Sequence, residues 1–146
     1  MKNKVYITGI GIVSAIGQGK EKFWNNLLNG ESGVREFENY KQSNSTSKKA
    51  AVIEDFDPKE FIQKINFRRL SNYSRYTIAA IEQAILDGVD VLNYSISGGY
   101  DSHNDPVELA FLAAHEAGIN VAASAGNAGA YQSVNHVSPW LLSVGS

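Results

Sequence analysis

The sequence predicts an α/β protein: a mostly parallel sheet of four or five strands with covering helices, packed as one compact domain. Short apolar segments rich in β-branched residues alternate with segments whose apolar residues recur at helical spacing. The links in the second half are short, and a strand, helix and strand joined in this way form a parallel βαβ unit. The 146 residues are enough to bury roughly two-thirds of the surface exposed by the unfolded chain.

Val5 to Ile10 is the first expected strand, because it is apolar and contains several β-branched residues. A turn punctuated by glycines follows it. Apolar residues at helical spacing predict a helix around residues 23–28, with Gly30 just beyond its last turn. Residues 41–49 are polar and predict an exposed loop. Asp57 and the proline after it predict the capped start of a short helix.

A longer helix is expected from about Leu70 to Leu86. Its apolar residues recur at steps of three and four, which keeps one face inward, and Gly88 ends it. The remaining expected elements are strands at residues 89–96, 119–124 and 141–144, and a helix from the acid-proline start at Asp105 to Ala117.

The composition argues against several classes of function. The formal net charge is −2 and no basic stripe is present, so we expect no nucleic-acid partner. No apolar run approaches the roughly 20 residues of a membrane span, so no membrane partner is expected. The chain has no cysteine, which excludes disulfides, thiolate metal sites and a thiol nucleophile. We expect no metal and no cofactor.

Two interpretations of the N-terminus are set aside. The stretch from Val5 to Ile16 contains polar residues and two glycines but no leucine, so we expect no signal peptide and a cytoplasmic location on expression. Gly9 and Gly11 could begin a dinucleotide fingerprint. Its third glycine is missing, however, and the following residues stay apolar instead of opening a capped helix.

The first 80 residues hold several motifs in register: ITGIG at 7–11, FW at 23–24, FDP at 56–58 and RR at 68–69. Together they resemble the N-terminus of β-ketoacyl-ACP synthases of the elongating type. The resemblance implies a thiolase-like fold and condensation through a cysteine and two histidines that lie beyond the matched stretch. Because the chain has no cysteine, we do not expect that activity.

Residues 78–146 contain GVDVLN at 88–93 and ASAGNAG at 123–129. They resemble the central part of subtilisin-like serine peptidases. The resemblance implies that Asn127 corresponds to the side-chain donor of the oxyanion hole. Such a donor stabilises the negative oxygen that develops during acyl transfer. An asparagine that simply takes a turn conformation beside glycines is the alternative. The resemblance also implies main-chain pairing of a substrate peptide with five residues: Ser95, Ile96, Ser97, Gly98 and Gly99.

No catalytic residue is expected. The aspartate, histidine and serine motifs of the subtilisin-like family lie outside the matched residues, so Asn127 would be vestigial. None of the three histidines, His103, His115 and His136, is expected to form an improvised triad. A shallow groove is expected at the carboxyl ends of the parallel strands. We expect the glycine-containing segments to meet there: Gly9 and Gly11, Ser95 to Gly99, and Gly126 to Gly129.

The join between the two resemblances falls near Ile78 to Ala84, inside the long helix, and divides the chain into segments 1–80 and 81–146. The first hypothesis is a non-catalytic chimera without an intact active site. An alternative is a peptide-binding remnant of a subtilisin-like endopeptidase. Another is a ketosynthase-like fragment that contacts acyl carrier protein through Arg68, Arg69 and Arg75. The expected partners are an extended peptide or a second copy of the chain, because each half has lost packing partners.

Overall fold

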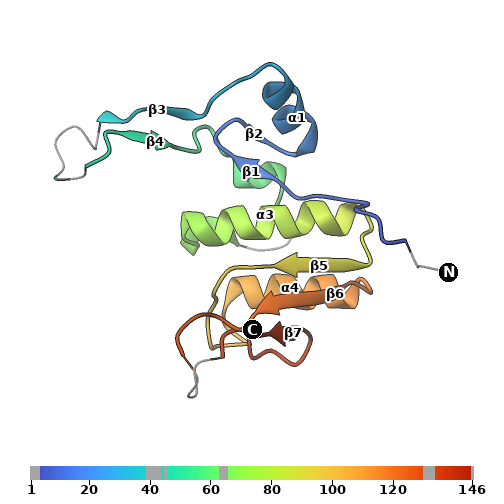
Figure 1. Ribbon diagram of the computed structural model, residues 1–146. Coiled ribbons are helices and arrows are strands. Elements are labelled where there is room, and N and C mark those ends of the chain that lie inside the picture. The colour runs from blue at the N-terminus through green and yellow to red at the C-terminus, as the bar shows by residue number, and fades with distance from the viewer. Residues whose placement is uncertain (1–3, 39–43, 45, 63–65, 130–133, 146) are drawn as a thin grey trace.

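The protein, described by a computed structural model, centres on helix α3 (Asn72–Leu86), which lies between the N-terminal elements and a parallel sheet (Figure 1). The sheet contains β5 (Val91–Tyr94), β6 (Asn120–Ser124) and β7 (Leu142–Val144), in the order β5-β6-β7. Helix α4 (Pro106–Glu116) connects β5 to β6 and packs against α3. The structure describes residues 4–38, 44, 46–62, 66–129 and 134–145.

The elements that precede α3 are short. They are β1 (Val13–Ser14), β2 (Gly17–Gln18), α1 (Lys20–Leu28), β3 (Val34–Glu36), β4 (Lys49–Ala51) and two single-turn 3₁₀ helices, η1 (Pro58–Glu60) and η2 (Phe67–Arg69). β1 pairs with β2 and β3 with β4, both antiparallel. The β3–β4 hairpin extends away from the rest of the chain (Figure 1). No helix in the described part of the chain has the length and apolar character needed to cross a membrane.

The α/β class and the parallel βαβ arrangement are confirmed, but the size of the sheet is not. Among the described residues the parallel sheet has three strands instead of four or five. The expected strand at Val5–Ile10 belongs to no sheet. Nearby backbone donors are satisfied by side chains of α3 or the residue after it: Ile10 N donates to Asp87 Oδ2 at 3.3 Å, and Ile12 N to Gln83 Oε1 at 3.2 Å. A strand needs backbone acceptors from a neighbour, and here side chains take their place.

The predicted helix starts are confirmed by their caps. Asp57 Oδ1 accepts from Lys59 N at 3.0 Å, and Asp105 Oδ1 accepts from Val107 N at 2.8 Å. α3 begins slightly later than expected, because Ser71 is its N-cap. In the expected loop at 41–49, residues 41–43 and 45 lie outside the described residues, and Lys49 begins β4.

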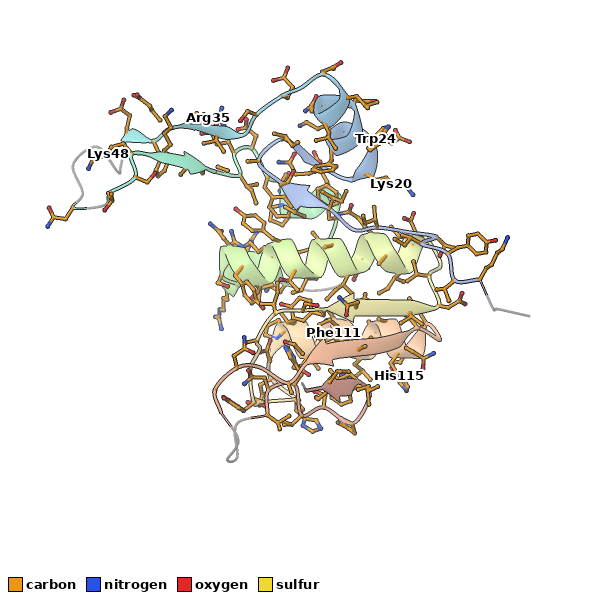
Figure 2. All side chains as sticks on the ribbon, viewed as in Figure 1. Lys20, Trp24, Arg35, Lys48, Phe111 and His115 are labelled. Atoms are coloured by element: carbon orange, nitrogen blue, oxygen red, sulfur yellow. The ribbon has the colours of Figure 1, made fainter. Side chains whose placement is uncertain are left out.

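The apolar core lies between α3, α4 and one face of the sheet. Near the expected join, Ile78, Ile81 and Ala84 are buried, as predicted for the inward face of this helix, whereas Tyr73, predicted on the same face, is 44% exposed. Phe111 of α4 is fully buried close to β5, where its ring meets that of Tyr94 edge-on at a centroid distance of 5.1 Å (Figure 2). The residues at which the join is expected therefore lie inside a packed core.

Other apolar side chains remain without cover. Val5, Ile7 and Leu86 have exposed fractions of 94%, 90% and 81%. Trp24 lies on α1 and is also exposed (Figure 2). Trp140, by contrast, is half-buried, and its Nε1 donates to the carbonyl of Glu108 at 2.9 Å. Exposed apolar side chains therefore occur in both halves of the chain, because Leu86 and Leu142, which is 65% exposed, lie in the second half.

Polar contacts at the end of α3 hold the N-terminal segment in place. Lys20 Nζ lies 2.6 Å from Asp87 Oδ1, and the other carboxylate oxygen accepts from the backbone of Ile10. The hydrogen bond from Lys20 lowers the pKa of Asp87 below its ordinary value of 3.8. One side chain therefore joins two separate points of the N-terminal segment to α3.

Replacing Asp87 with asparagine should loosen residues 10–20 from α3. Asp87→Asn removes the ion pair with Lys20 at almost constant side-chain volume, so amide protection at Ile10 should fall while the sheet keeps its protection. Asp90→Asn, which neutralises an exposed carboxylate in the turn before β5, is the matched control. Hydrogen exchange followed by NMR measures both variants. Equal exchange in the two would contradict the role given to Asp87.

Acidification should have the same effect on the unmodified protein. A carboxylate whose pKa is lowered by folding contributes stability above its unfolded pKa, and that contribution disappears as the pH falls through the folded pKa. For Asp87 the contact should therefore persist at pH values above 3.8 and weaken below it.

The exposed apolar side chains should promote self-association and binding of an apolar dye. Sedimentation over a range of concentrations, with dye fluorescence in parallel, measures both properties. Ile7→Lys places a charge on an exposed side chain and should reduce both, without loss of secondary structure. A monomer that binds no dye at any concentration would contradict this expectation.

Candidate functional site

The residues expected to bind a peptide lie in the loop after β5. The side chains of Ser95, Ile96 and Ser97 are exposed there, and the two following glycines are half-buried. The loop after β6 carries Gly126 and Asn127. Because β5 and β6 are parallel neighbours, the two loops leave the sheet at the same edge, where ligands bind in open α/β sheets.

These loops approach one another closely. A Cβ added to Gly126 would lie only 2.2 Å from Asn135 Oδ1 and 3.6 Å from Ser97 Oγ, and Gly126 has a φ of 86°. Only glycine fits that position without strain. Two backbone hydrogen bonds join the segment before β7 to the other two loops. Asn135 N donates to the carbonyl of Ala125 at 3.0 Å, and His136 N donates to the carbonyl of Gly99 at 3.3 Å.

A buried polar cluster lies beneath the loop after β5. The side chains of His136 and Glu108 have exposed fractions of 0% and 1%. His136 Nδ1 is hydrogen-bonded to Glu108 Oε1, and Ser138 Oγ donates to Glu108 Oε2. On the other side of the ring, His136 Nε2 lies 2.9 Å from the carbonyl oxygen of Ile96. The cluster thus joins α4 to the expected peptide-binding loop.

The contacts of His136 determine where protons can be. Its Nε2 faces a carbonyl oxygen, which can only accept, so Nε2 carries a hydrogen and donates it to Ile96. Between Nδ1 and Glu108 Oε1 a single proton satisfies the contact, whichever group carries it. Every buried side-chain polar atom in the described residues has a partner. The cluster is therefore satisfied, and it is closed to solvent.

The sequence did not indicate Glu108 or Ser138 as site residues, and His136 was not expected to act in catalysis. One signal was available: Glu108 is the only charged residue in an otherwise apolar stretch from Pro106 to Ala114. A buried carboxylate requires a partner. The sequence did not indicate that the partner would be His136, which follows 28 residues later.

The expectation that Gly9 and Gly11 lie at the same edge as Ser95 to Gly99 is wrong. A Cβ added to Gly9 would lie 2.6 Å from Asp87 Cβ, and one added to Gly11 would lie 1.9 Å from the carbonyl oxygen of Ala80. Both glycines therefore allow close packing on α3 and the turn after it. Neither glycine stands at the end of a sheet strand, although both line, with Ile96, a groove between α3 and β5.

A groove of about 490 Å³ separates residues 9–13 from β5, with α3 as its third wall. Its lining is mainly apolar, and the hydroxyls of Tyr73 and Tyr94 are hydrogen-bonded to each other at its wall. Burial raises the pKa of Tyr94, and the hydrogen bond with Tyr73 raises it further, so the phenol remains neutral. The groove coincides with the space beside the unpaired edge of β5.

Asn127 and two of the three histidines lie at the surface. Asn127 is exposed in a bend after β6. His103 is exposed and meets the ring of Trp140 edge-on at a centroid distance of 5.8 Å. His115 is exposed on α4 (Figure 2). In the described ranges, no three carboxylate, histidine or cysteine side chains gather in a way that could hold a metal ion.

The N-terminal part of the chain is similar to ketosynthases. The sequence model of the beta-ketoacyl synthase N-terminal domain matches residues 2–90. The chain is 35% identical to the 3-oxoacyl-[acyl-carrier-protein] synthase 2 of Vibrio harveyi over 86 residues, which cover 59% of this chain and 21% of that protein.

The chain is also similar to plant subtilisin-like proteases. It is 40% identical over 91 residues to subtilisin-like protease SBT2.1 of Arabidopsis thaliana, covering 58% of this chain and 11% of that protein. Identity to SBT1.7 of the same plant is 45% over 76 residues, covering 51% of this chain and 10% of that protein. The chain thus spans only a small part of the length of its relatives of either kind.

The chain therefore has a dual similarity. The shares covered by the ketosynthase of Vibrio harveyi and by SBT2.1 together exceed the whole chain, so the two alignments have residues in common. The match to the ketosynthase model extends to residue 90, beyond the join expected at Ile78 to Ala84. Because that match spans more than half of the chain, the chain belongs to the beta-ketoacyl synthase family through its N-terminal domain.

Proposed function

We propose that this chain is a non-catalytic chimeric protein that binds an extended peptide along Ser95–Gly99. The observation that carries the proposal is the loop itself. Its side chains at Ser95 to Ser97 are exposed, and it follows the carboxyl end of β5. On the protein side, His136 Nε2 is hydrogen-bonded to its backbone at the Ile96 carbonyl. A surface loop with a fixed main chain is suited to main-chain pairing with an extended ligand.

The contacts of Ile96 limit how a peptide can pair. Its carbonyl oxygen already accepts from His136, which leaves the main-chain groups of Ser95 and Ser97 for the ligand. Ile96 also exposes its side chain, which offers an apolar contact next to these groups. An extended peptide with apolar side chains fits this combination of polar main chain and apolar surface better than a charged nucleotide does.

The absence of catalysis is supported by the sequence and by the contacts of the histidines. Thiolate chemistry requires a cysteine, and the sequence has none. Acyl transfer by the serine triad of the subtilisin-like family uses an imidazole as its base. The ring nitrogens of His136 are occupied by Glu108 and Ile96, and the hydroxyl of Ser138 is directed to Glu108 instead of the ring. Asn127 would then stabilise an oxyanion that never forms.

Neither the peptidase activity nor the ketosynthase activity of the two similar families should be detectable. Casein should remain intact, a fluorophosphonate probe should label no serine, and malonyl-carrier protein should decarboxylate no faster than in a protein-free blank. The heat-denatured protein is the control in each assay. Covalent labelling of a serine, or decarboxylation that is lost on denaturation, would refute the proposal of a non-catalytic protein.

Peptide binding should be visible by NMR. Titration with an extended apolar peptide should shift the amide signals of Ser95–Gly99 and of Gly126, which lies next to Ser97. NAD serves as the comparison ligand and should shift none of these signals. Shifts at Gly9 and Gly11 with NAD, and none at Ser95–Gly99 with peptide, would favour the dinucleotide hypothesis instead.

A further inference from the structure

We infer that Glu108 and His136 form a positioning pair that holds the main chain of Ser95–Gly99 in one conformation, ready to accept a peptide. The effect of this pair on peptide binding rests on the proposed function. The effect of the pair on the conformation of the loop is independent of that function. The pair belongs to neither the ketosynthase nor the peptidase chemistry described above.

The pair connects three parts of the chain that are distant in sequence. Glu108 lies in the first turn of α4, His136 in the segment before β7, and Ile96 in the loop after β5. The imidazole spans the space between the Glu108 carboxylate and the Ile96 carbonyl, with one ring nitrogen directed to each. The loop after β5 is thus linked to α4 through a single side chain. Rotation of the imidazole ring would break both hydrogen bonds at once.

The loop is shaped to fit against the imidazole. A Cβ added to Gly98 would lie 1.9 Å from His136 Cε1, so the backbone of Gly98 rests directly on the ring. The backbone of His136 adds a second link, from its N–H to the carbonyl of Gly99. The loop therefore accepts hydrogen bonds from His136 at the carbonyls of Ile96 and Gly99, and between them Gly98 packs against the imidazole ring.

The surroundings of His136 keep the ring in this orientation. Its edge-on neighbours are Tyr94, at a centroid distance of 5.5 Å, and Phe111, at 5.9 Å. The backbone of His136 has a φ of 55°, which residues with a side chain rarely adopt. Ser143 Oγ donates to the His136 carbonyl and helps to hold this backbone. The position is thus determined from several sides.

Glu108 fixes the orientation by hydrogen bonding, and this allows a conservative replacement. In Glu108→Gln the side-chain amide can donate to His136 Nδ1, while its oxygen accepts from Ser138. His136 Nε2 then still donates to Ile96. Glu108→Met has a similar volume but offers Nδ1 no partner, and a buried unpaired nitrogen is unfavourable.

The test measures the loop in the free protein first. Hydrogen exchange of the His136 amide, which donates to the carbonyl of Gly99, should accelerate about tenfold in Glu108→Met, as expected for one lost buried hydrogen-bond partner. In Glu108→Gln it should change by less than about twofold. Glu116→Gln, at an exposed glutamate of the same helix, is the matched control and should leave the loop unchanged. Unchanged exchange in Glu108→Met, or equal acceleration in the glutamine and methionine variants, would overturn the inference.

A spectrum of the unmodified protein provides a check that needs no variant. The imidazole nitrogen signals of His136 should show a hydrogen-bonded proton on Nε2 that exchanges slowly with water. An imidazole that alternates between tautomers, with rapid proton exchange, would overturn the inference even if Glu108→Met failed to fold.

Peptide affinity is measured last, with the apolar peptide used for the NMR titration. The affinity should fall in Glu108→Met by a factor similar to the acceleration of exchange and should be retained in Glu108→Gln. If the unmodified protein does not bind the peptide, the proposed function fails. The exchange data then still decide whether the positioning pair exists, so the two failures can be told apart.

Discussion

The structure depends on the packing of α3, because this helix has to satisfy two sets of neighbours at once. Its buried residues, among them Ile78 and Ile81, pack toward α4 and the sheet. The polar end of the helix and the residue after it, through Gln83 and Asp87, contact the backbone of the N-terminal segment. A break in the helical register between these two groups would separate the halves of the chain. The continuous apolar face is therefore the condition on which the rest of the fold rests.

The two sides of α3 are held by different combinations of interactions. Toward the sheet the contact is apolar and closely packed, and Phe111 is fully buried there. Toward the N-terminus, hydrogen bonds and the ion pair of Lys20 with Asp87, whose lysine is half exposed, accompany apolar packing. Ile62 is 3% exposed in the core, and the ring of Phe56 meets that of Tyr76 on α3 edge-on at a centroid distance of 5.0 Å. Apolar burial contributes more per contact than an ion pair open to water.

The candidate site shows how a buried polar cluster can serve a surface loop. An unpaired glutamate under the sheet edge would be unfavourable, and His136 and Ser138 together satisfy both of its oxygens. The ring that satisfies Glu108 also fixes the carbonyl of Ile96. Stability and the shape of the loop therefore depend on the same contacts. Small residues complete the arrangement, because Gly98 and Gly126 let the neighbouring segments approach within contact distance.

The helix starts and the parallel βαβ unit of the second half could be predicted from residues close together in the chain, whereas the short hairpins β1–β2 and β3–β4 could not. Proline and acid at Asp57 and Asp105 set helix starts, and apolar spacing set the inward face of α3, because both depend on residues close together in the chain. The sequence did not reveal that Val5–Ile10 pairs with no strand. Its β-branched composition favours a strand, but a strand also requires a neighbour with free backbone acceptors. Likewise, the sequence placed Glu108 in an apolar helix, yet only folding brought His136 to it, since their contact joins residues far apart in the chain.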